Sequence, residues 1–215
     1  DTSAISGDDI GFARLTTQYD GNFISVDENN VLVSLNTATN AWERVGINTV
    51  ENEFEQAVDI LHYGERLYVL TSDQIYRHQR VENGEYGPGT AWLADPLDLS
   101  TAKAITIDGS VWIGSNGVIR KLEKGREIGA ATASIDPPLG QITDLWTNAD
   151  ITLLFILDPD NNRVIVYNKE TQALIAQYTD NQFGSAFGVS VDLPGKTATV
   201  YAPTTVLTFS LSGVL

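Results

Sequence analysis

The chain is 215 residues long and acidic, with 13 Lys and Arg against 28 Asp and Glu and a formal net charge of −15 at pH 7. Because such a surface repels a phosphate backbone, we expect no nucleic-acid partner. Cys is absent, which excludes disulfides, thiolate metal sites and a cysteine nucleophile.

One strand-rich unit recurs along the chain at a nearly constant spacing. Five similar segments are centred on Ile24, Tyr68, Trp112, Phe155 and Thr199, which are 44, 44, 43 and 44 residues apart. A period of about 40 to 45 residues with several strands per unit is typical of β-propeller blades. We therefore predict an all-β fold, a single β-propeller domain over residues 1–215, with five four-stranded blades.

Turns rich in Asp, Asn and Gly separate short apolar runs, so strands can be assigned in chain order. The repeat 13–46 is predicted to contain strands 13–18, 23–27, 31–35 and 41–45, and the repeat 57–93 strands 57–61, 66–70, 74–79 and 89–93. The repeat 104–130 is predicted to contain strands 104–107, 110–114, 118–122 and 126–130, and the repeat 142–179 strands 142–146, 153–157, 163–168 and 174–178. The aromatic residues Tyr68, Trp112 and Phe155, at second-strand centres, are expected to pack between blades.

The last repeat, 187–215, is incomplete. It supplies strands 187–191, 197–201 and 206–211, and the sequence ends before a fourth. Residues 1–6 precede the first strand and have the length of the missing one. We expect them to complete the last blade, which closes the ring and leaves no unpaired edges. The alternative is part of a larger ring whose other blades lie outside this sequence.

One segment resembles a known family. Leu157 to Thr171 reads Leu-Asp-Pro-Asp-Asn-Asn-Arg-Val-Ile-Val-Tyr-Asn-Lys-Glu-Thr. It is similar to blades of NHL-like and YVTN-type bacterial propellers, including extracytoplasmic regions of proteins anchored by a single membrane helix. The resemblance covers about a fifth of the chain. It implies a propeller used for binding outside the cytoplasm and carries no catalytic residue, whereas the family's propellers have six or seven blades.

Metal sites receive little support from the sequence. Asp158 to Asn162 alternates oxygen ligands of the kind that Ca²⁺ takes, but the Gly and bidentate Glu of a full calcium loop are absent. Asp27 to Asn30 occupies the equivalent place in the first repeat, so a structural turn is favoured. His62 and His78 are interpreted as surface or hairpin residues. We predict no metal and no cofactor.

A paired-carboxylate enzyme is the alternative function. Asp59 and Asp144 occupy matching places on predicted inner strands, and glycoside hydrolysis needs two carboxyl groups at a defined separation. The loops are near minimal, however, and isolated acids on inner strands more often pair with a neighbouring blade. We therefore predict no catalytic residue.

The favoured ligand site is the mouth of the central channel. Gln56, Lys103, Gln141 and Ser185 fall in one column at the predicted starts of inner strands, beside Asp59 and Asp144. Such a polar ring suits a ligand held in a concave mouth. The alternatives are that these residues only solvate strand ends, or that the long hairpin from Arg80 to Pro88 binds a protein partner.

These patterns together favour a non-enzymatic binding scaffold, a monomer located outside a bacterial cytoplasm, that recognises a protein, a peptide or a glycan. No segment has the roughly 20 apolar residues that a membrane helix needs, so this segment is not expected to insert into a bilayer. A membrane anchor outside the sequence stays open.

Overall fold

The computed structural model describes residues 4, 5, 11–131 and 135–215. The chain divides into two compact units, 1–100 and 101–215, and each is described by itself. The division falls between the second and third sequence repeats. Among the described residues, no helix has the length and apolar character needed to cross a bilayer.

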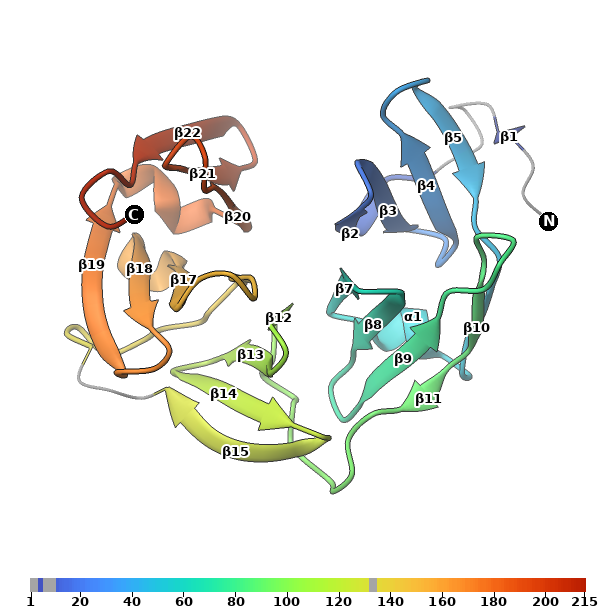
Figure 1. Cartoon of the computed structure of the whole chain (residues 1–215), viewed down its shortest axis with the longest axis horizontal. Helices are drawn as coiled ribbons and strands as arrows, with labels where there is room; N and C mark the ends of the chain where they lie inside the picture. The colour runs from blue at the N-terminus through green and yellow to red at the C-terminus, as the bar shows by residue number, and fades with distance from the viewer. Residues whose placement is uncertain (1–3, 6–10, 132–134) are drawn as a thin grey trace. The chain divides into compact units, whose positions relative to one another are not determined.

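The first unit contains two antiparallel sheets and one short parallel pair (Figure 1). The first sheet has the order β1(Ala4–Ile5), β5(Ala41–Arg44), β4(Leu32–Asn36), β3(Asn22–Asp27), β2(Ala13–Tyr19). The second sheet has the order β11(Thr90–Ala91), β9(Ile75–Gln79), β8(Arg66–Leu70), β7(Asp59–Tyr63). Strands β6(Ile47–Asn48) and β10(Tyr86–Pro88) pair in parallel, and the helix α1(Glu53–Gln56) precedes β7.

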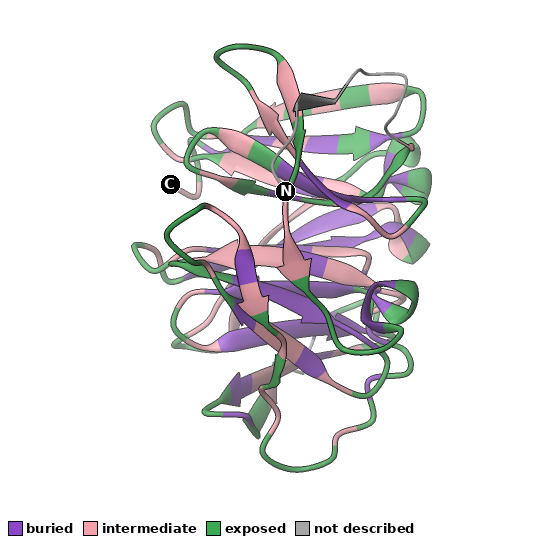
Figure 2. Cartoon of the chain, turned by 90° about the vertical axis from the view of Figure 1, so that its right-hand side faces the viewer, coloured by how far each residue is buried: buried purple, intermediate pink, exposed green. Residues whose placement is uncertain are grey.

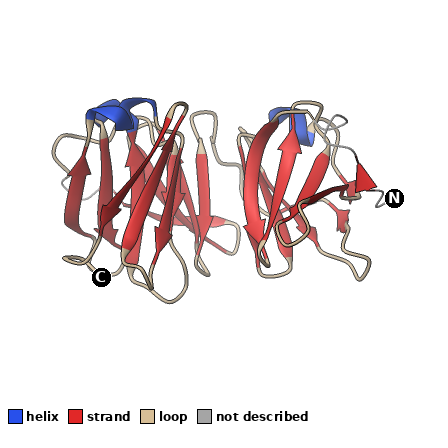
Figure 3. Cartoon of the chain, turned by 90° about the horizontal axis from the view of Figure 1, so that it is seen from above, coloured by secondary structure: helices blue, strands red, loops and turns tan. Residues whose placement is uncertain are grey.

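The second unit contains three antiparallel sheets. The third sheet has the order β12(Ala104–Ile107), β13(Val111–Ser115), β14(Val118–Glu123), β15(Arg126–Ala131). The fourth has the order β16(Asp144–Trp146), β17(Leu153–Asp158), β18(Arg163–Asn168), β19(Ala173–Thr179), and the fifth has β20(Gly188–Asp192), β21(Thr197–Ala202), β22(Thr205–Ser210). Two 3-10 turns, η2(Pro159–Asn161) and η3(Asn181–Ser185), contact each other. Figure 3 shows the helical turns of each unit at one end of its strands.

The five sheets are the blades of a β-propeller fold, which confirms the predicted fold class. In each sheet the strands from β2 onward are ordered as they occur along the chain, as in the meander of a propeller blade, with β10 outside the second sheet; β1 is the exception, because it lies beside β5. Within each unit, the first strands of consecutive blades contact one another. Strand β2 contacts β7 in the first unit, and β16 contacts both β12 and β20 in the second. We call these five strands, including β20, the inner strands.

Apolar side chains of neighbouring blades form the core within each unit. Figure 2 shows the buried residues concentrated on the strands. One cluster joins the first two blades, with Ile24, Val26 and Leu32 against Ile60 and Leu67. Two further clusters join the third blade to the fourth and the fourth to the fifth. Tyr68, Trp112 and Phe155 are all buried, as expected for packing residues.

The expected closure of the last blade by residues 1–6 is wrong for the part that the structure describes. Ala4 pairs with Glu43, and Ile5 with Trp42, so β1 extends the outer edge of the first blade. The sheet that ends in β22 has three described strands. The outer strand of each blade presents an edge that can accept a strand, and the sequence pattern alone could not decide between β5 and β22.

Candidate functional site

The predicted column of mouth residues is only partly in register. Gln56, Gln141 and Ser185 each lie three residues before an inner strand, whereas Lys103 lies one residue before β12. Gln56 and Ser185 are the last residues of α1 and η3. The chain has to leave each helical turn before the next strand begins, so the segment between the residue and the strand is longer there than at Lys103.

The four mouth residues, Gln56, Lys103, Gln141 and Ser185, differ in their exposure to solvent and in the hydrogen bonds that they already make. Gln56, Lys103 and Ser185 are exposed, and Gln141 is partly buried. The Gln141 amide donates to the carbonyl oxygens of Thr101 at 3.3 Å and Ile142 at 3.1 Å. Lys103, Gln141 and Ser185 precede the inner strands of three consecutive blades in the second unit. Gln56 has the corresponding place in the first unit.

Asp59 and Asp144 occupy equivalent first positions on β7 and β16, in different units. The carboxylate of Asp144 accepts the backbone N–H of Leu145 and that of Val189, both at 2.7 Å. Val189 belongs to the next blade, so this acid does pair with a neighbouring blade. Burial raises the pKa of Asp144 to about 7, although the N–H groups of Val189 and Leu145 act in the opposite direction. Asp59 likewise accepts the N–H of Ile60, at 2.8 Å.

The interpretation of the histidines as surface or hairpin residues is wrong for His78. His78 is fully buried on β9, where Nε2 lies 2.6 Å from Glu53 Oε1 and Nδ1 lies 2.9 Å from the carbonyl oxygen of Gly87. His62 is partly buried, with its ring centroid 4.0 Å from that of Tyr19. The interpretation failed for His78 because the residue that buries and binds its ring, Glu53, is 25 residues away in the sequence, whereas His62 does lie at the hairpin between β7 and β8.

The Asp158 turn is structural in this fold. Asp158 is completely buried, and one of its carboxylate oxygens accepts Nε–H of Arg163 at 2.8 Å. The other carboxylate oxygen accepts the N–H of Gly140 at 3.3 Å, and this hydrogen bond joins the loop before β16 to β17. Asp27 does the same in the first blade, accepting the N–H of Gly11 at 3.2 Å. Across the described ranges, no group of three or more His, Cys, Asp or Glu side chains is arranged to hold a metal ion.

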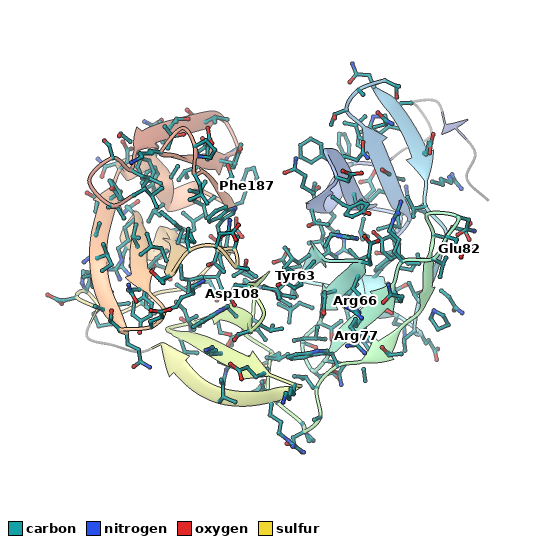
Figure 4. The ribbon with its side chains drawn as sticks, in the orientation of Figure 1. Tyr63, Arg66, Arg77, Glu82, Asp108 and Phe187 are labelled. Atoms are coloured by element: carbon teal, nitrogen blue, oxygen red, sulfur yellow. The ribbon has the colours of Figure 1, made fainter. Side chains whose placement is uncertain are left out.

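A groove of about 680 Å³ crosses the hairpin turns of the third and fourth blades. Trp112 forms part of its wall, and the indole Nε1–H donates to Asp108 at 3.1 Å. Lys169 donates to the other oxygen of Asp108 at 2.5 Å, and this ion pair joins the two blades. Lys121 lies 5.4 Å from the Trp112 ring centroid, and its ammonium is 3.4 Å from Glu123. Figure 4 labels Asp108 in this region.

The groove presents charged and hydrogen-bonding groups on rigid turns. Lys124 and Glu170 are exposed on its rim, while Asp108 is held by Trp112 and Lys169. A volume of several hundred Å³ is in the range of ligand sites. The sequence reasoning missed this groove because it depends on two successive blades placing their turns together.

A second cavity of about 190 Å³ lies in the first unit, beneath the hairpin that follows β9. Its lining includes Tyr19, Glu43, Arg80 and Tyr86. The only signal for it in the sequence was the greater length of this hairpin.

Comparison with known proteins supports the fold and nothing narrower. No model of a known protein family matches the chain, and no curated protein does. The solved structure of KlHsv2 with loop 6CD replaced by a Gly-Ser linker is similar, with a TM-score of 0.55 and 11% sequence identity. The match covers 92% of this chain and 63% of that chain, so this sequence spans less than two thirds of that propeller-like protein. At this identity the likeness shows a shared β-propeller fold.

Proposed function

We propose that this chain is a non-enzymatic binding domain that recognises a protein, a peptide or a glycan outside a bacterial cytoplasm. The groove of about 680 Å³ across the third and fourth blades carries this proposal. Its polar groups sit on short turns held by a rigid scaffold, which is where binding residues concentrate in such folds. The likeness of Leu157 to Thr171 to NHL-like and YVTN-type blades supports the extracytoplasmic location.

The mouth residues form a second candidate surface for the same ligand. Lys103 and Ser185 are exposed polar residues ahead of inner strands in the second unit, and Gln56 has the same character in the first. Lys103 favours an anionic group, because it is a cation on a protein with a formal net charge of −15. Asp144 stands just after these positions and binds the next blade through the N–H of Val189, and Asp59 has the equivalent place in the first unit.

Substitutions in the groove and at the mouth distinguish the two surfaces. The wild-type chain is applied to glycan and peptide arrays, and the best binder is titrated against Lys121→Gln with Lys124→Asn and against Lys103→Ala with Gln141→Ala. We expect the groove variant to lose at least tenfold in affinity and the mouth variant to retain it. The exposed hairpin residue Glu82 provides the control, Glu82→Gln. Binding that survives both double substitutions argues against both surfaces.

Glycoside hydrolysis is the second candidate, and one observation favours it. Burial raises the pKa of Asp144 to about 7, the range in which a carboxyl group can act as a general acid. Release of reducing sugar by the wild type, and its loss in Asp144→Asn, would replace the binding proposal. The two backbone N–H groups that Asp144 accepts favour the structural role.

A further inference from the structure

A smaller cavity adjoins the groove of the third and fourth blades. Its volume is about 190 Å³, and the two share four lining residues, Trp112, Lys121, Lys169 and Gln172. The outer strand of the third blade, β15, adds Ile128, Gly129 and Ala130 to the wall. We call this cavity the side cavity. Because it adjoins the groove, one ligand can occupy both.

A β-bulge places Ile128 on the wall of the side cavity. Consecutive residues of β14, starting at Lys121, pair with Gly129 and then with Glu127 on β15. Ile128 lies between them without a partner on β14, and it is 53% exposed. Bulges turn a side chain out of the normal alternation of a strand, and they are frequent beside functional sites. The bulge therefore explains why a large apolar side chain faces solvent at the edge of a cavity.

The fourth blade has a bulge at the equivalent position, and the two blades differ in the residues beside it. There, Ile175 is the extra residue before Ala176 on β19, and it is 46% exposed. Val166 is fully buried, and Ala176 packs against the core between the fourth and fifth blades, so side chains fill this junction. At the same two positions the third blade has Lys121 and Gly129. A Cβ atom at Gly129 would meet no atom beyond its chain neighbours within 4 Å, so these residues leave the side cavity open.

The walls of the side cavity suit an aliphatic side chain better than a sugar ring. Trp112 is 3% exposed and Tyr167 is 0% exposed, so neither ring offers a face on which a sugar could stack. On the β15 wall, Ile128 and Gly129 are exposed. The volume equals that of about six water molecules, which is room for one large side chain. An apolar side chain in such a recess is a typical anchor of a peptide or protein ligand.

Among the described residues, the groove beside the side cavity has a lysine without an ionic partner. Lys121 is already engaged, with its ammonium 3.4 Å from Glu123 and 5.4 Å from the ring centroid of Trp112. Lys124 is exposed on the turn between β14 and β15 and makes no ion pair in the part of the chain that the structure describes. Glu170 is an exposed acid on the rim of the fourth blade, so an acidic group of a ligand belongs at the third. Lys124 is therefore the natural partner for a carboxylate of the ligand.

Gln172 lines both the groove and the side cavity and can bind a ligand that extends between them. Its side chain is exposed, and its amide forms no hydrogen bond within the described ranges. An amide can both donate to and accept from a peptide backbone. A peptide therefore uses the recess, the amide and the cation together, whereas a sugar would leave the recess empty.

We propose that the groove binds a peptide in which a large aliphatic residue stands next to an acidic one. The aliphatic side chain occupies the side cavity against Ile128 and Gly129. The carboxylate binds Lys124, and the peptide backbone forms hydrogen bonds with Gln172. This ligand class rests on the proposed function, and it narrows a protein, a peptide or a glycan to one kind of peptide.

The test is an NMR titration of the isotope-labelled full chain with capped hexapeptides. Each probe carries Leu beside Asp, in either order, within a run of glycines, and the comparison peptides replace Leu by Ser or Asp by Asn. We expect one of the probes with Leu beside Asp to bind and to shift the amide signals of residues 128–130. Loss of the Leu side chain should weaken binding by about tenfold or more, and loss of the Asp charge by about threefold.

Gly129→Val fills the side cavity without straining the fold. Gly129 is not in the left-handed region and its Cβ position is open, so the variant should keep the wild-type melting temperature and lose about tenfold or more in affinity. Ile128→Ser removes the aliphatic wall and should also lose about tenfold. Ile175→Ser is the matched control, because Ile175 has the same place in a bulge and a similar exposure but lines neither the groove nor the side cavity.

Lys124→Gln isolates the contact with the carboxylate. It should bind the Asp and Asn peptides equally, because the charge that distinguishes them is gone, and a remaining preference for Asp would overturn this contact. The side-cavity assignment is overturned if no probe binds, or if Gly129→Val and Ile128→Ser both bind like the wild type. It is also overturned if Ile175→Ser weakens binding as much as Ile128→Ser does.

Failure of this ligand class can be told apart from failure of the proposed function. A glycan that binds on the arrays and is lost in Lys121→Gln with Lys124→Asn would keep the groove as the binding surface and overturn only the peptide. A peptide that is lost in that double variant but tolerates Gly129→Val would overturn only the side cavity. If neither the arrays nor the titration finds a ligand, both the ligand class and the proposed function are overturned.

Discussion

Arg163 donates Nε–H to Oδ2 of Asp158 over 2.8 Å, in an ion pair whose side chains are 1% and 0% exposed. The same guanidinium donates to Gln177 at 2.7 Å and to the carbonyl oxygen of Pro137 at 2.6 Å. One arginine therefore connects β17, β19 and the segment before β16. A buried pair with every polar group satisfied is costly to break from one side, because the remaining charge is left unpaired.

Arg163→Met is expected to lower the free energy of unfolding by about 3–5 kcal/mol, the usual cost of removing one member of a buried ion pair. Urea unfolding followed by circular dichroism measures it. Arg66→Met is the matched control, since Arg66 is exposed on β8 (Figure 4) and its loss should cost less than about 0.5 kcal/mol. Equal stability of the two variants would show that the Asp158 pair contributes nothing net.

The buried contact between His78 and Glu53 predicts a local effect. Glu53 begins α1 and also accepts the N–H of Val50 at 2.8 Å, so His78→Leu should loosen the α1 segment. We expect faster amide hydrogen exchange over residues 50–57 than in the wild type. Glu55→Gln changes an exposed acid of the same helix and should leave exchange unchanged. If residues 50–57 exchange at the same rate in His78→Leu as in the wild type, the contact between His78 and Glu53 does not stabilise α1.

The strands could be predicted from the sequence because local signals specify them. Val118 to Leu122 was expected to form a strand and β14 covers Val118–Glu123, since a turn with Lys124 and Gly125 at positive φ ends it. The helix α1 was missed because one turn, Glu53–Gln56, is too short to show a helical period.

The candidate sites depend on contacts that no local pattern encodes. The cavity in the first unit needs the parallel pairing of β6 with β10, which brings Tyr86 against the first blade. The burial of His78 needs Glu53, which is 25 residues away. Repeat spacing predicts equivalent positions but not which of them carry unpartnered polar groups.

Trp112 is expected to contribute to the stability of the fold through packing, and not to recognise a ligand. It is 3% exposed, so Trp112→Ala should cost roughly 3–5 kcal/mol in the free energy of unfolding. Trp112→Phe keeps most of the volume and loses the hydrogen bond to Asp108, so about 1 kcal/mol is expected. Both values come from urea unfolding. A fully stable Trp112→Ala chain that has lost ligand binding would make this indole a recognition residue of the groove.

His62 should make the fold less stable in acid. Burial lowers its pKa from the ordinary 6.5 to about 4, with Glu65 acting in the opposite direction and Arg80 in the same direction. Between these values the unfolded chain takes up a proton that the folded chain refuses, so this contribution is lost as pH falls. His62→Phe keeps a ring beside Tyr19 and should unfold less readily than the wild type at pH 4.5. A stability difference that does not change between pH 4.5 and 7.5 would contradict the assignment.

Asp144 should make the stability of the fold depend on pH in the opposite direction to His62. Burial raises its pKa from the ordinary 3.8 to about 7, so the folded chain holds a proton that the unfolded chain has released. The stabilisation is complete below about pH 4 and is lost as pH rises through 7.

Asp144→Asn tests this, because an amide cannot titrate. The variant also places an NH₂ group against one of the two backbone N–H donors, so it should be less stable than the wild type at pH 4.5. The difference in the free energy of unfolding between wild type and variant should decrease toward pH 8, because only the wild type loses stability as Asp144 ionises. Asp150→Asn, at an exposed turn of the same blade, should differ little from the wild type at either pH. The His62 and Asp144 effects oppose each other over overlapping pH ranges, so a flat wild-type profile is compatible with both, and only single variants separate them. A difference that stays constant between pH 4.5 and pH 8 would show that Asp144 is ionised in the fold, and would remove the general-acid argument together with this prediction.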